Sequence, residues 1–361
     1  MKKIKVLIVG AGPAGCSTAF FLKYLDKDEN IDVKIVDKLE SDKYDRYHDM
    51  CGEATSTDIL KDISPLKPKG IVGKINQIKE FYPNDIEIKT KMDGILFDRP
   101  VFFNSIVKEF IKLGGKYQIG TSKDFSQKNN KVKIKFNDGF EEYDYVVAAD
   151  GANSIFRKKI GLKGHTKTLL QYVVEKKPID KKSLIFHYDE KYQGDYLWEF
   201  PHNGNTKIGF PLIKGKSFDI KEKILKKQAR LIAFGGLKKY TDNRIALVGD
   251  AACQVNPITK GGIRPSMVAG KLAAKAIINR DIKQYQIEWG KTAFCSKIFM
   301  DAFQKLKNMD NKELVLHMKP FIDCDFESFF SKCKLYIRIF LFYRKYLDLY
   351  KAYELSNNYG W

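Results

Sequence analysis

Several features that would assign the chain to a class are missing from the sequence. No run of about 18 uncharged apolar residues is present, so we expect no membrane-spanning helix. Glycines interrupt the apolar N-terminal segment and no small-residue cleavage site follows it, which argues against a signal peptide and predicts a cytoplasmic protein. None of the six cysteines forms a Cys-x-x-Cys pair, so we predict free thiols and no metal site.

Acidic residues are scarce relative to basic ones. The chain has 64 Lys and Arg against 44 Asp and Glu, a formal net charge of +20 over 361 residues. Such a surplus suits an anionic partner, either nucleic acid, a membrane face or a phosphorylated substrate. A lysine-rich proteome that spreads lysine over every surface explains it equally well. No nucleic-acid-binding motif accompanies the charge, so we predict no nucleic-acid partner.

Residues 4–37 carry a dinucleotide-binding pattern. An apolar run over 4–9 predicts a buried parallel strand, a helical pattern follows, and a second strand over 32–36 leads into an aspartate. A Gly-x-Gly-x-x-Gly turn joins strand to helix, which permits a tight turn, brings the backbone close to a pyrophosphate and lets the helix pack on the strand. The acid can accept hydrogen bonds from a ribose. The predicted binding residues are Gly10, Gly12, Ala14, Gly15 and Asp37.

Two later segments narrow the choice of dinucleotide. Residues 145–154 and 244–252 each predict a strand that ends in small residues at a helix start, with Asp150-Gly151 in the first and Gly249-Asp250 in the second. Small residues let a ligand approach closely, and the Asp250 carboxylate can hold a hydroxyl of a polyol chain. No second Gly-x-Gly-x-x-Gly follows a strand, so we expect no separate NAD(P)H domain.

The order and spacing of these segments resemble the flavoprotein superfamily of aromatic hydroxylases and related reductases. The resemblance covers the chain to about residue 285 and implies tightly bound, extended FAD. It implies an α/β fold, with a Rossmann-like FAD-binding domain, an inserted antiparallel-sheet substrate domain and a helical C-terminal region. The expected ranges are 1–62, 95–165 and 238–285 for the FAD domain, 63–94 and 166–237 for the substrate domain, and 286–361 for the helical region.

Four further segments resemble the geranylgeranyl reductase family. They are His48–Ala54 with its Cys-Gly pair, Asp98–Phe103 with its Asp-Arg pair, Gly194–Pro201 with an aromatic-x-Trp-x-Phe-Pro pattern, and Asn256–Pro265 with its glycine cluster. The resemblance implies an FAD-dependent reductase that saturates C=C double bonds of polyprenyl chains, in archaeal-type membrane lipids or their phosphorylated precursors. An FAD-dependent monooxygenase and a non-catalytic lipid-binding flavoprotein are the alternatives.

The resemblance also assigns roles to residues. Cys51 is the expected catalytic proton donor, although it could instead only shape the pocket, with water or Glu53 as the proton source. A thiol with an ordinary pKa of about 8.5 is mostly protonated at neutral pH, which suits a donor. Strand alternation puts three aromatic side chains on one face as a wall for the prenyl chain: Tyr196, Trp198 and Phe200. The further residues implied in FAD binding are Cys51, Gly52, Ala54, Arg99, Lys123, Asp250, Gly262 and Ile263.

Three questions stay open at this point. The external reductant could be NAD(P)H, a deazaflavin or reduced ferredoxin, and an acidic ferredoxin would suit the positive charge. Lys260 departs from the family pattern and could either stabilise a reduced flavin or point into solvent. The aromatic and basic stretch over 332–345 could lie on an anionic membrane face, pack against the FAD domain or close the lipid cavity.

Overall fold

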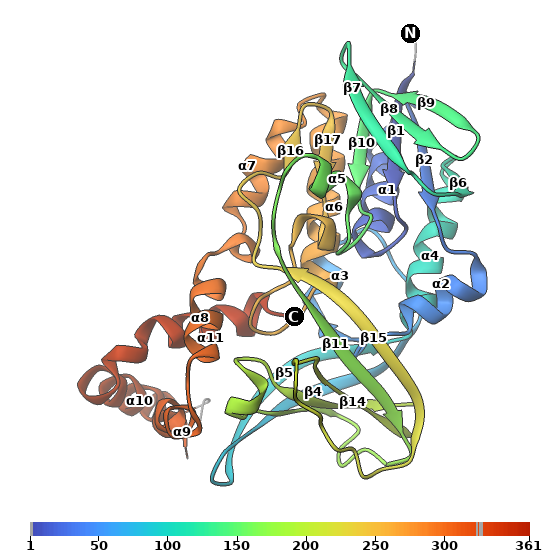
Figure 1. Ribbon diagram of the computed structural model, residues 1–361. Coiled ribbons are helices and arrows are strands. Elements are labelled where there is room, and N and C mark those ends of the chain that lie inside the picture. Colours follow the sequence, from blue (N-terminus) through green and yellow to red (C-terminus); the bar gives the residue numbers. More distant parts are fainter. Residues whose placement is uncertain (1–2, 323, 325–327) are drawn as a thin grey trace.

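The computed structural model describes residues 3–322, 324 and 328–361 and contains two large sheets, one at each end of the molecule (Figure 1). The six-stranded sheet has the order β16-β17-β10-β1-β2-β6. All its neighbours pair in parallel except β16, which runs against β17. Its strands are β1 (Ile4–Val9), β2 (Ile31–Asp37), β6 (Lys116–Ile119), β10 (Tyr145–Ala148), β16 (Thr241–Asp242) and β17 (Ile245–Leu247).

Long helices and a small sheet complete this half of the molecule. The helices are α1 (Pro13–Leu25), α2 (Ser41–His48), α3 (Asp58–Asp62), α4 (Arg99–Lys112), α5 (Ile155–Lys159), α6 (Ile263–Ile278) and α7 (Lys283–Lys291). The three-stranded sheet contains β7 (Asp124–Lys128), β8 (Lys131–Phe136) and β9 (Gly139–Tyr143). The strands β1 and β10 are apolar and buried along most of their length, as expected for parallel strands covered on both faces.

The second large sheet has eight strands in the order β15-β11-β14-β13-β12-β4-β5-β3. It is antiparallel, as expected for the inserted segments, except that β4 and β12 pair in parallel. The chain between β4 and β12 passes through the six-stranded half of the molecule. This long connection allows β12 to run parallel to β4. The strands are β3 (Ala54–Ser56), β4 (Ile71–Tyr82), β5 (Ile86–Phe97), β11 (His165–Val174), β12 (Ser183–His187), β13 (Leu197–His202), β14 (Asn205–Pro211) and β15 (Ile224–Phe234).

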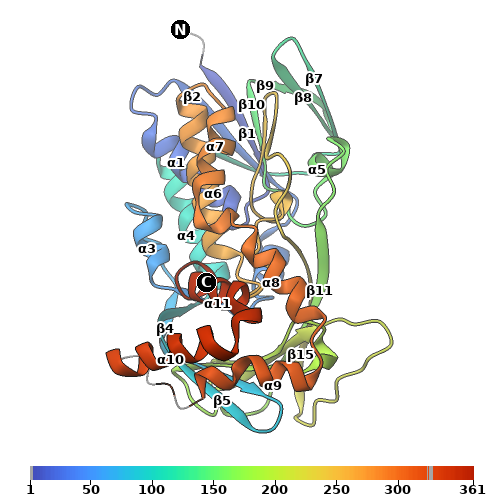
Figure 2. The ribbon, with the colours of Figure 1, turned by 90° about the vertical axis from the view of Figure 1, so that its left-hand side faces the viewer.

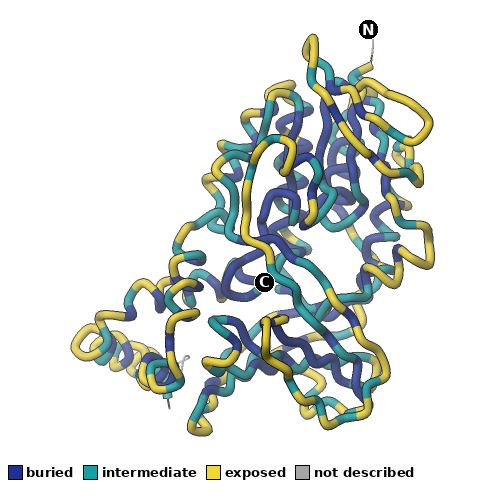
Figure 3. The backbone as a smooth tube through the Cα atoms, in the orientation of Figure 1, coloured by how far each residue is buried: buried dark blue, intermediate teal, exposed yellow. Residues whose placement is uncertain are grey.

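The C-terminal region is helical, as the sequence predicts, and lies beside the eight-stranded sheet (Figure 1). Its helices are α8 (Ile298–Lys307), α9 (Asn311–Met318), α10 (Phe329–Phe342) and α11 (Leu347–Tyr359). The buried core is concentrated in the six-stranded half, whereas these helices expose much of their length (Figure 3). None of the described helices has the length and apolarity needed to cross a membrane. The exact domain boundaries stay a prediction, although β5 extends to Phe97, past the expected boundary at residue 94.

Candidate functional site

Two neighbouring hollows lie between the six-stranded half and the eight-stranded sheet. The glycine-lined hollow, of about 210 Å³, follows the ends of β1, β2 and β10 and the start of α1. The aromatic hollow, of about 140 Å³, lies between the 50–55 segment, β13, β15 and the 255–263 loop. Both hollows are lined by Pro13, Arg230 and Asp250. They therefore adjoin, and one elongated ligand can occupy both.

The Gly-x-Gly-x-x-Gly turn opens α1 toward these hollows. A side chain at Gly15 would place its Cβ 1.9 Å from the carbonyl oxygen of Gly10, so only glycine lets the helix approach the strand this closely. The helix has Gly12 at its N-cap and no side-chain cap, which leaves its N–H groups and positive dipole end directed at the ligand site. This arrangement is typical of a pyrophosphate-binding turn.

Asp37 ends β2 at the edge of the glycine-lined hollow. Its Oδ2 accepts a hydrogen bond from the backbone N–H of Ala11 at 2.6 Å, and its Oδ1 accepts one from the N–H of Leu39 at 2.8 Å. The carboxylate therefore stabilises the turn in addition to the ribose contact that the sequence predicts, since a carboxylate has lone pairs for several donors.

Buried polar atoms without a protein partner are concentrated around the two hollows. Such an atom costs about 1–3 kcal/mol when it stays unpaired, so a cluster of them favours a polar ligand. Among the described residues, no hydrogen-bond partner is found for His48 Nδ1, Ser122 Oγ and Asp150 Oδ1 in the glycine-lined hollow or for Thr55 Oγ1, Arg99 Nε, Gln171 Oε1 and Trp198 Nε1 in the aromatic hollow. These residues fit an extended flavin dinucleotide.

Arg99 is the buried cation of this set. It begins α4 behind the N-cap Asp98, and its residue is 3% exposed. Burial lowers the pKa of its guanidinium, and the group lies over the ring of Phe103 at 5.3 Å. A buried guanidinium with an unpaired Nε favours an anionic ligand such as a phosphate.

Asp250 lies where the two hollows meet. The sequence predicts that it opens a helix, but Gly249–Ala252 forms only a short 3-10 turn, and the long helix α6 starts at Ile263. Arg157 holds this turn by donating from Nη1 to the carbonyl oxygens of Asp250 at 3.0 Å and Ala251 at 3.1 Å. Burial raises the pKa of Asp250, so a hydroxyl ligand that donates to its carboxylate would favour the ionised form.

The three aromatic residues of the 196–200 segment lie together, as strand alternation predicts. Tyr196, Trp198 and Phe200 are buried in one apolar cluster and all line the aromatic hollow. Trp361, whose significance the sequence does not signal, lines the same hollow and packs against Phe200 with 6.5 Å between ring centroids. The hollow therefore has an apolar wall suited to a hydrocarbon chain.

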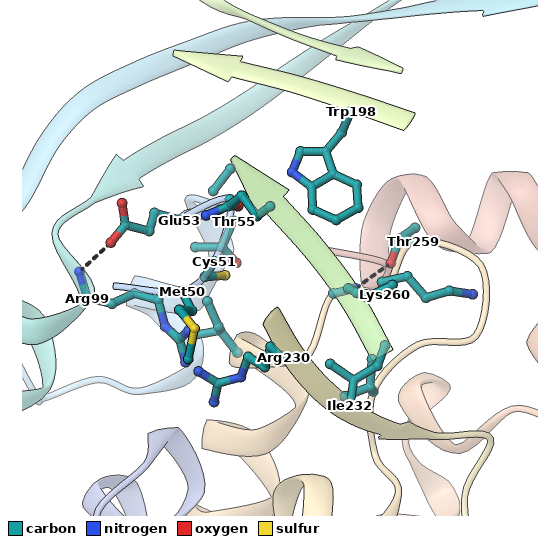
Figure 4. A pocket seen from close by; sticks show the side chains of 18 of the residues that line it. Met50, Cys51, Glu53, Thr55, Arg99, Trp198, Arg230, Ile232, Thr259 and Lys260 are labelled. Carbon is teal, nitrogen blue, oxygen red and sulfur yellow. Dashed lines mark hydrogen bonds between the residues drawn. The ribbon is translucent and has the colours of Figure 1, made fainter. Parts of the chain in front are cut away.

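Cys51 lies in the loop between α2 and β3 and lines the aromatic hollow. Figure 4 shows it with Arg99 and Arg230 to one side and Trp198 to the other. A Cβ at Gly52 would lie 2.5 Å from the ring of Phe200, so glycine is needed for the loop to reach the aromatic wall. The structure thus brings the predicted thiol and the predicted aromatic wall into one cavity.

Lys207 fixes the Cys51 loop by hydrogen bonds. It lies on β14, is fully buried, and donates from Nζ to Glu53 Oε2 at 2.6 Å, to the carbonyl oxygen of Cys51 at 3.1 Å and to that of Asp49 at 3.3 Å. Burial raises the pKa of Glu53, and Lys207 offsets only part of that effect. Burial also opposes ionisation of Asp49, but Lys207 and Lys226 outweigh it and lower the pKa of that carboxyl.

The 256–262 loop forms the opposite side of the hollow. Asn256 Oδ1 accepts hydrogen bonds from the N–H groups of Ile258 and Thr259 at 2.8 and 3.1 Å, and Gly262 caps α6 without a side-chain hydrogen bond. Uncapped N–H groups and the positive helix end are therefore present where the glycine cluster is expected to meet the flavin.

Lys260 does not point into solvent. Its side chain is 5% exposed, and its Nζ pairs with Asp195 at 2.7 Å and lies 4.0 Å from the ring centroid of Phe303. Burial lowers the pKa of Lys260, and Asp195 opposes that shift. The amine is therefore held by an acid and an aromatic ring of the chain, which leaves the backbone of this loop facing the hollow.

Nearly all predicted site residues line one of the two hollows. Gly10, Gly12, Ala14 and Asp37 line the glycine-lined hollow, and the aromatic hollow is lined by Cys51, Gly52, Ala54, Arg99, Tyr196, Trp198, Phe200, Gly262 and Ile263, with Asp250 common to both. Gly15 acts through helix packing instead. Lys123 lines neither hollow: it is exposed, and the neighbouring 120–122 segment takes the position beside the ligand site. The contact of Lys123 with FAD stays a prediction.

Three residues of the site were missed by sequence reasoning. Arg230 on β15 lines both hollows, Lys207 holds the Cys51 loop, and Trp361 closes the aromatic wall. Arg230 is one of three cations on β15 and Lys207 is the single cation on β14, and no motif distinguishes them from the other cations of a lysine-rich chain. Trp361 has no local signal at all.

Comparisons with known proteins agree with the motifs. No protein-family model matches the chain. A digeranylgeranylglycerophospholipid reductase of Methanopyrus kandleri is 27% identical over 359 residues, which cover 86% of this chain and 92% of that protein. A protein of the same description from Methanococcoides burtonii is 28% identical over 373 residues, covering 90% of this chain and 89% of that one. These relatives confirm the resemblance to the geranylgeranyl reductases.

Solved structures agree on the fold. A geranylgeranyl bacteriochlorophyll reductase-like protein from Thermoplasma acidophilum superimposes with a TM-score of 0.77 at 20% identity, covering 98% of this chain and all of that one. A p-nitrophenol 4-monooxygenase from Pseudomonas putida gives a TM-score of 0.63 at 16% identity, with 99% and 98% coverage. The predicted fold class, α/β with an inserted, mainly antiparallel sheet and a helical C-terminal region, is confirmed.

Proposed function

Because the chain is a homologue of the geranylgeranyl reductases, we propose that it is an FAD-dependent oxidoreductase. It saturates the C=C double bonds of geranylgeranyl chains in archaeal-type glycerophospholipids or their phosphorylated precursors. The observation that carries this proposal is the junction of the two hollows at Pro13, Arg230 and Asp250. A site with phosphate-binding features thereby continues into a cavity with an aromatic wall.

Residues of both hollows bind the cofactor. Gly10, Gly12 and the start of α1 bind the pyrophosphate together with Arg99, and Asp250 accepts from a ribityl hydroxyl. The uncapped start of α6 stabilises negative charge on the cofactor. Bound FAD, once reduced, supplies the hydride for one alkene carbon.

The aromatic hollow binds the prenyl chain and excludes water from it. Tyr196, Trp198 and Phe200 contact the hydrocarbon. An isolated alkene is a poor hydride acceptor, so a proton must be held close to the second carbon. Cys51 Sγ holds that proton, and Lys207 fixes the loop that carries it. Water or Glu53 remains the alternative donor, and either would leave Cys51 to shape the cavity.

Electrons reach the cofactor from an external donor that docks transiently. The sequence has no second dinucleotide-binding motif, so NAD(P)H, a deazaflavin or reduced ferredoxin has to approach without a dedicated domain. The net charge of +20 would steer an acidic ferredoxin toward the molecule. A substrate of this class resides in a bilayer, so the enzyme also has to meet an anionic membrane surface.

The test is turnover followed by mass spectrometry. The protein, reconstituted with FAD and reduced under anaerobic conditions, is incubated with a digeranylgeranylglycerophospholipid. Each saturated double bond adds two hydrogens to the lipid, and a series of such additions is the expected result. An unchanged lipid mass with a cofactor that reduces and reoxidises would indicate the non-catalytic flavoprotein. In a parallel incubation in air, oxygen consumption coupled to hydroxylation of the lipid would indicate the monooxygenase.

A further inference from the structure

The helix α10 exposes an unusual amount of apolar surface. The side chains concerned are 58% to 82% exposed, and they are Phe329, Phe330, Tyr336, Ile337, Phe340, Leu341 and Phe342. Monomeric proteins rarely leave a contiguous apolar patch of this kind in water, and such a patch marks an interaction site. The helix runs along the outside of the molecule, away from the six-stranded half (Figure 2).

The other side of the same helix anchors it to the protein. Leu335 and Ile339 are buried in a cluster that includes Ile258 and the buried residues of α11. At about 3.6 residues per turn, these two anchors lie on one side of the helix. Phe329, Ile337 and Phe340 project from the opposite side. The exposed face that includes Ile337 and Phe340 is therefore a consequence of how α10 packs, whereas Phe342, the last residue of the helix, lies on the anchored side.

The charged residues of α10 itself and of the turn that follows it have one sign. Between residues 328 and 346 the sequence has no Asp or Glu and five cations, which are Lys332, Lys334, Arg338, Arg344 and Lys345. On the helical wheel, Lys332 flanks one border of the apolar face, and Lys334 and Arg338 flank the other. The aliphatic stems of Lys332 and Lys334 can lie along the apolar surface while their charged groups reach outward, whereas Arg338 donates from Nη1 to the carbonyl oxygen of Pro320 at 3.3 Å. Lys345 pairs with Glu313, and Arg344 lies 5.0 Å from the ring centroid of Phe340.

We propose that the exposed face of α10 docks on an anionic phospholipid bilayer, with Phe330, Ile337, Leu341 and their neighbours among the acyl chains. The flanking Lys332 and Lys334 bind the lipid phosphates. An aromatic and aliphatic face bordered by cations on both sides is typical of helices that lie in the membrane interface. The helix is too short to span the bilayer, so it lies in the plane of the surface.

Docking at this helix would hold the substrate site near the lipid. The apolar cluster that anchors α10 includes Ile258 of the loop that lines the aromatic hollow, and α11 leads into Trp361 on the wall of that hollow. The inference goes beyond the proposed reductase activity, because the docking face requires neither FAD nor a prenyl substrate. Vesicle binding can therefore be measured without turnover.

The test is co-sedimentation of the full chain with vesicles of phosphatidylcholine that contain about one third phosphatidylglycerol. We expect binding at low salt that weakens in pure phosphatidylcholine and at high salt. The double substitution Ile337→Glu with Leu341→Glu should reduce binding by at least about tenfold, because it places two charges in the apolar face. Exposed Phe140 on β9 provides the control, since Phe140→Glu changes an apolar surface residue remote from α10 and should leave binding unchanged.

A second pair of variants separates charge from apolar contact. Lys332→Gln with Lys334→Gln should lower binding to the anionic vesicles by about 25-fold, because each of the two cations near such a surface contributes about fivefold. Lys133→Gln with Lys135→Gln on β8 is the matched control and should have little effect. Cofactor content and unfolding temperature, measured for every variant, identify any that fail to fold.

Three results would overturn the proposal. The wild-type protein could fail to bind anionic vesicles at low salt, or the Ile337→Glu, Leu341→Glu variant could bind as well as the wild type. The wild type could also be a dimer that this double substitution converts to monomers, which would assign the face to a second copy of the chain. Reductase activity on detergent-solubilised lipid reports on the proposed function alone, so its loss or retention does not enter this test.

Discussion

Replacing Lys207 by methionine is the most informative single change that the structure suggests. The side chain is 0% exposed, and its Nζ lies 2.6 Å from Glu53 Oε2, whose residue is 7% exposed. Methionine keeps the length and volume of the chain but removes the charge. Breaking a buried ion pair by removing one partner costs about 3–5 kcal/mol when the other charge stays uncompensated. Glu53 can avoid that cost only by taking up a proton.

The loss of stability in Lys207→Met depends on pH because the Glu53 carboxyl loses its ion-pair partner. Burial already raises the pKa of Glu53 above its ordinary value of 4.5, and loss of Lys207 raises it further. Between that ordinary value and the raised one, the folded protein holds a proton that the unfolded chain has released, so stability falls as pH rises. Each unit by which the pKa rises adds about 1.4 kcal/mol to this loss. We expect Lys207→Met to cost about 1 kcal/mol at pH 5 and about 3 kcal/mol at pH 8.

The assay is urea unfolding of the wild type and the variant at both pH values, with two controls. The double variant Lys207→Met with Glu53→Gln should regain much of the loss at pH 8, since it removes the unpaired carboxylate. Lys226→Met removes the more exposed partner of Asp49 and should cost less than about 1 kcal/mol. A loss from Lys207→Met that is equal at pH 5 and pH 8, or that is no larger than that of Lys226→Met, would refute the reasoning.

Three further predictions concern the reaction and the cofactor. Cys51→Ala should leave FAD content and flavin reduction unchanged and lower the rate of alkene saturation at least about tenfold, some 1.4 kcal/mol of barrier; saturation at the wild-type rate would leave Cys51 as a packing residue. Trp198→Ala should slow turnover of a long prenyl chain more than flavin reduction, and equal loss of both would indicate a structural role. Asp250→Ala should weaken FAD retention, measured by release on dialysis, far more than Asp242→Ala on the short strand β16, and equal retention would contradict the ribityl contact.

The elements that a sequence can reveal are those with local causes. The Gly-x-Gly-x-x-Gly turn, the β13–β14 hairpin and the capped start of α4 each depend on a few consecutive residues. Asn203 and Gly204, for example, adopt φ values of +48° and +81°, which the Asn-Gly pair tolerates and a two-residue hairpin turn requires. Turns and helix starts of this kind can be predicted without knowledge of the rest of the chain.

The features that were missed depend on contacts between distant segments. The parallel pairing of β4 with β12 joins strands about a hundred residues apart, and strand periodicity carries no information about which strands pair. The ion pair of Lys207 with Glu53 spans 154 residues. Trp361 reaches the aromatic wall only because α11 packs beside it. Residue type and spacing cannot reveal such contacts.

Several features that cost stability are concentrated around Cys51. Glu53 adopts a left-handed backbone conformation with φ of +61°, and Lys260 on the opposite side of the hollow does so with φ of +54°; such positions cost on the order of 1 kcal/mol each for residues other than glycine. The Lys207 ammonium is buried, and Arg99 Nε has no partner among the described residues. A loop that only joined α2 to β3 would need none of these features. Their concentration around one thiol and one aromatic wall is what a site under functional constraint shows, and it favours the Cys51 loop as the part of the chain where the chemistry takes place.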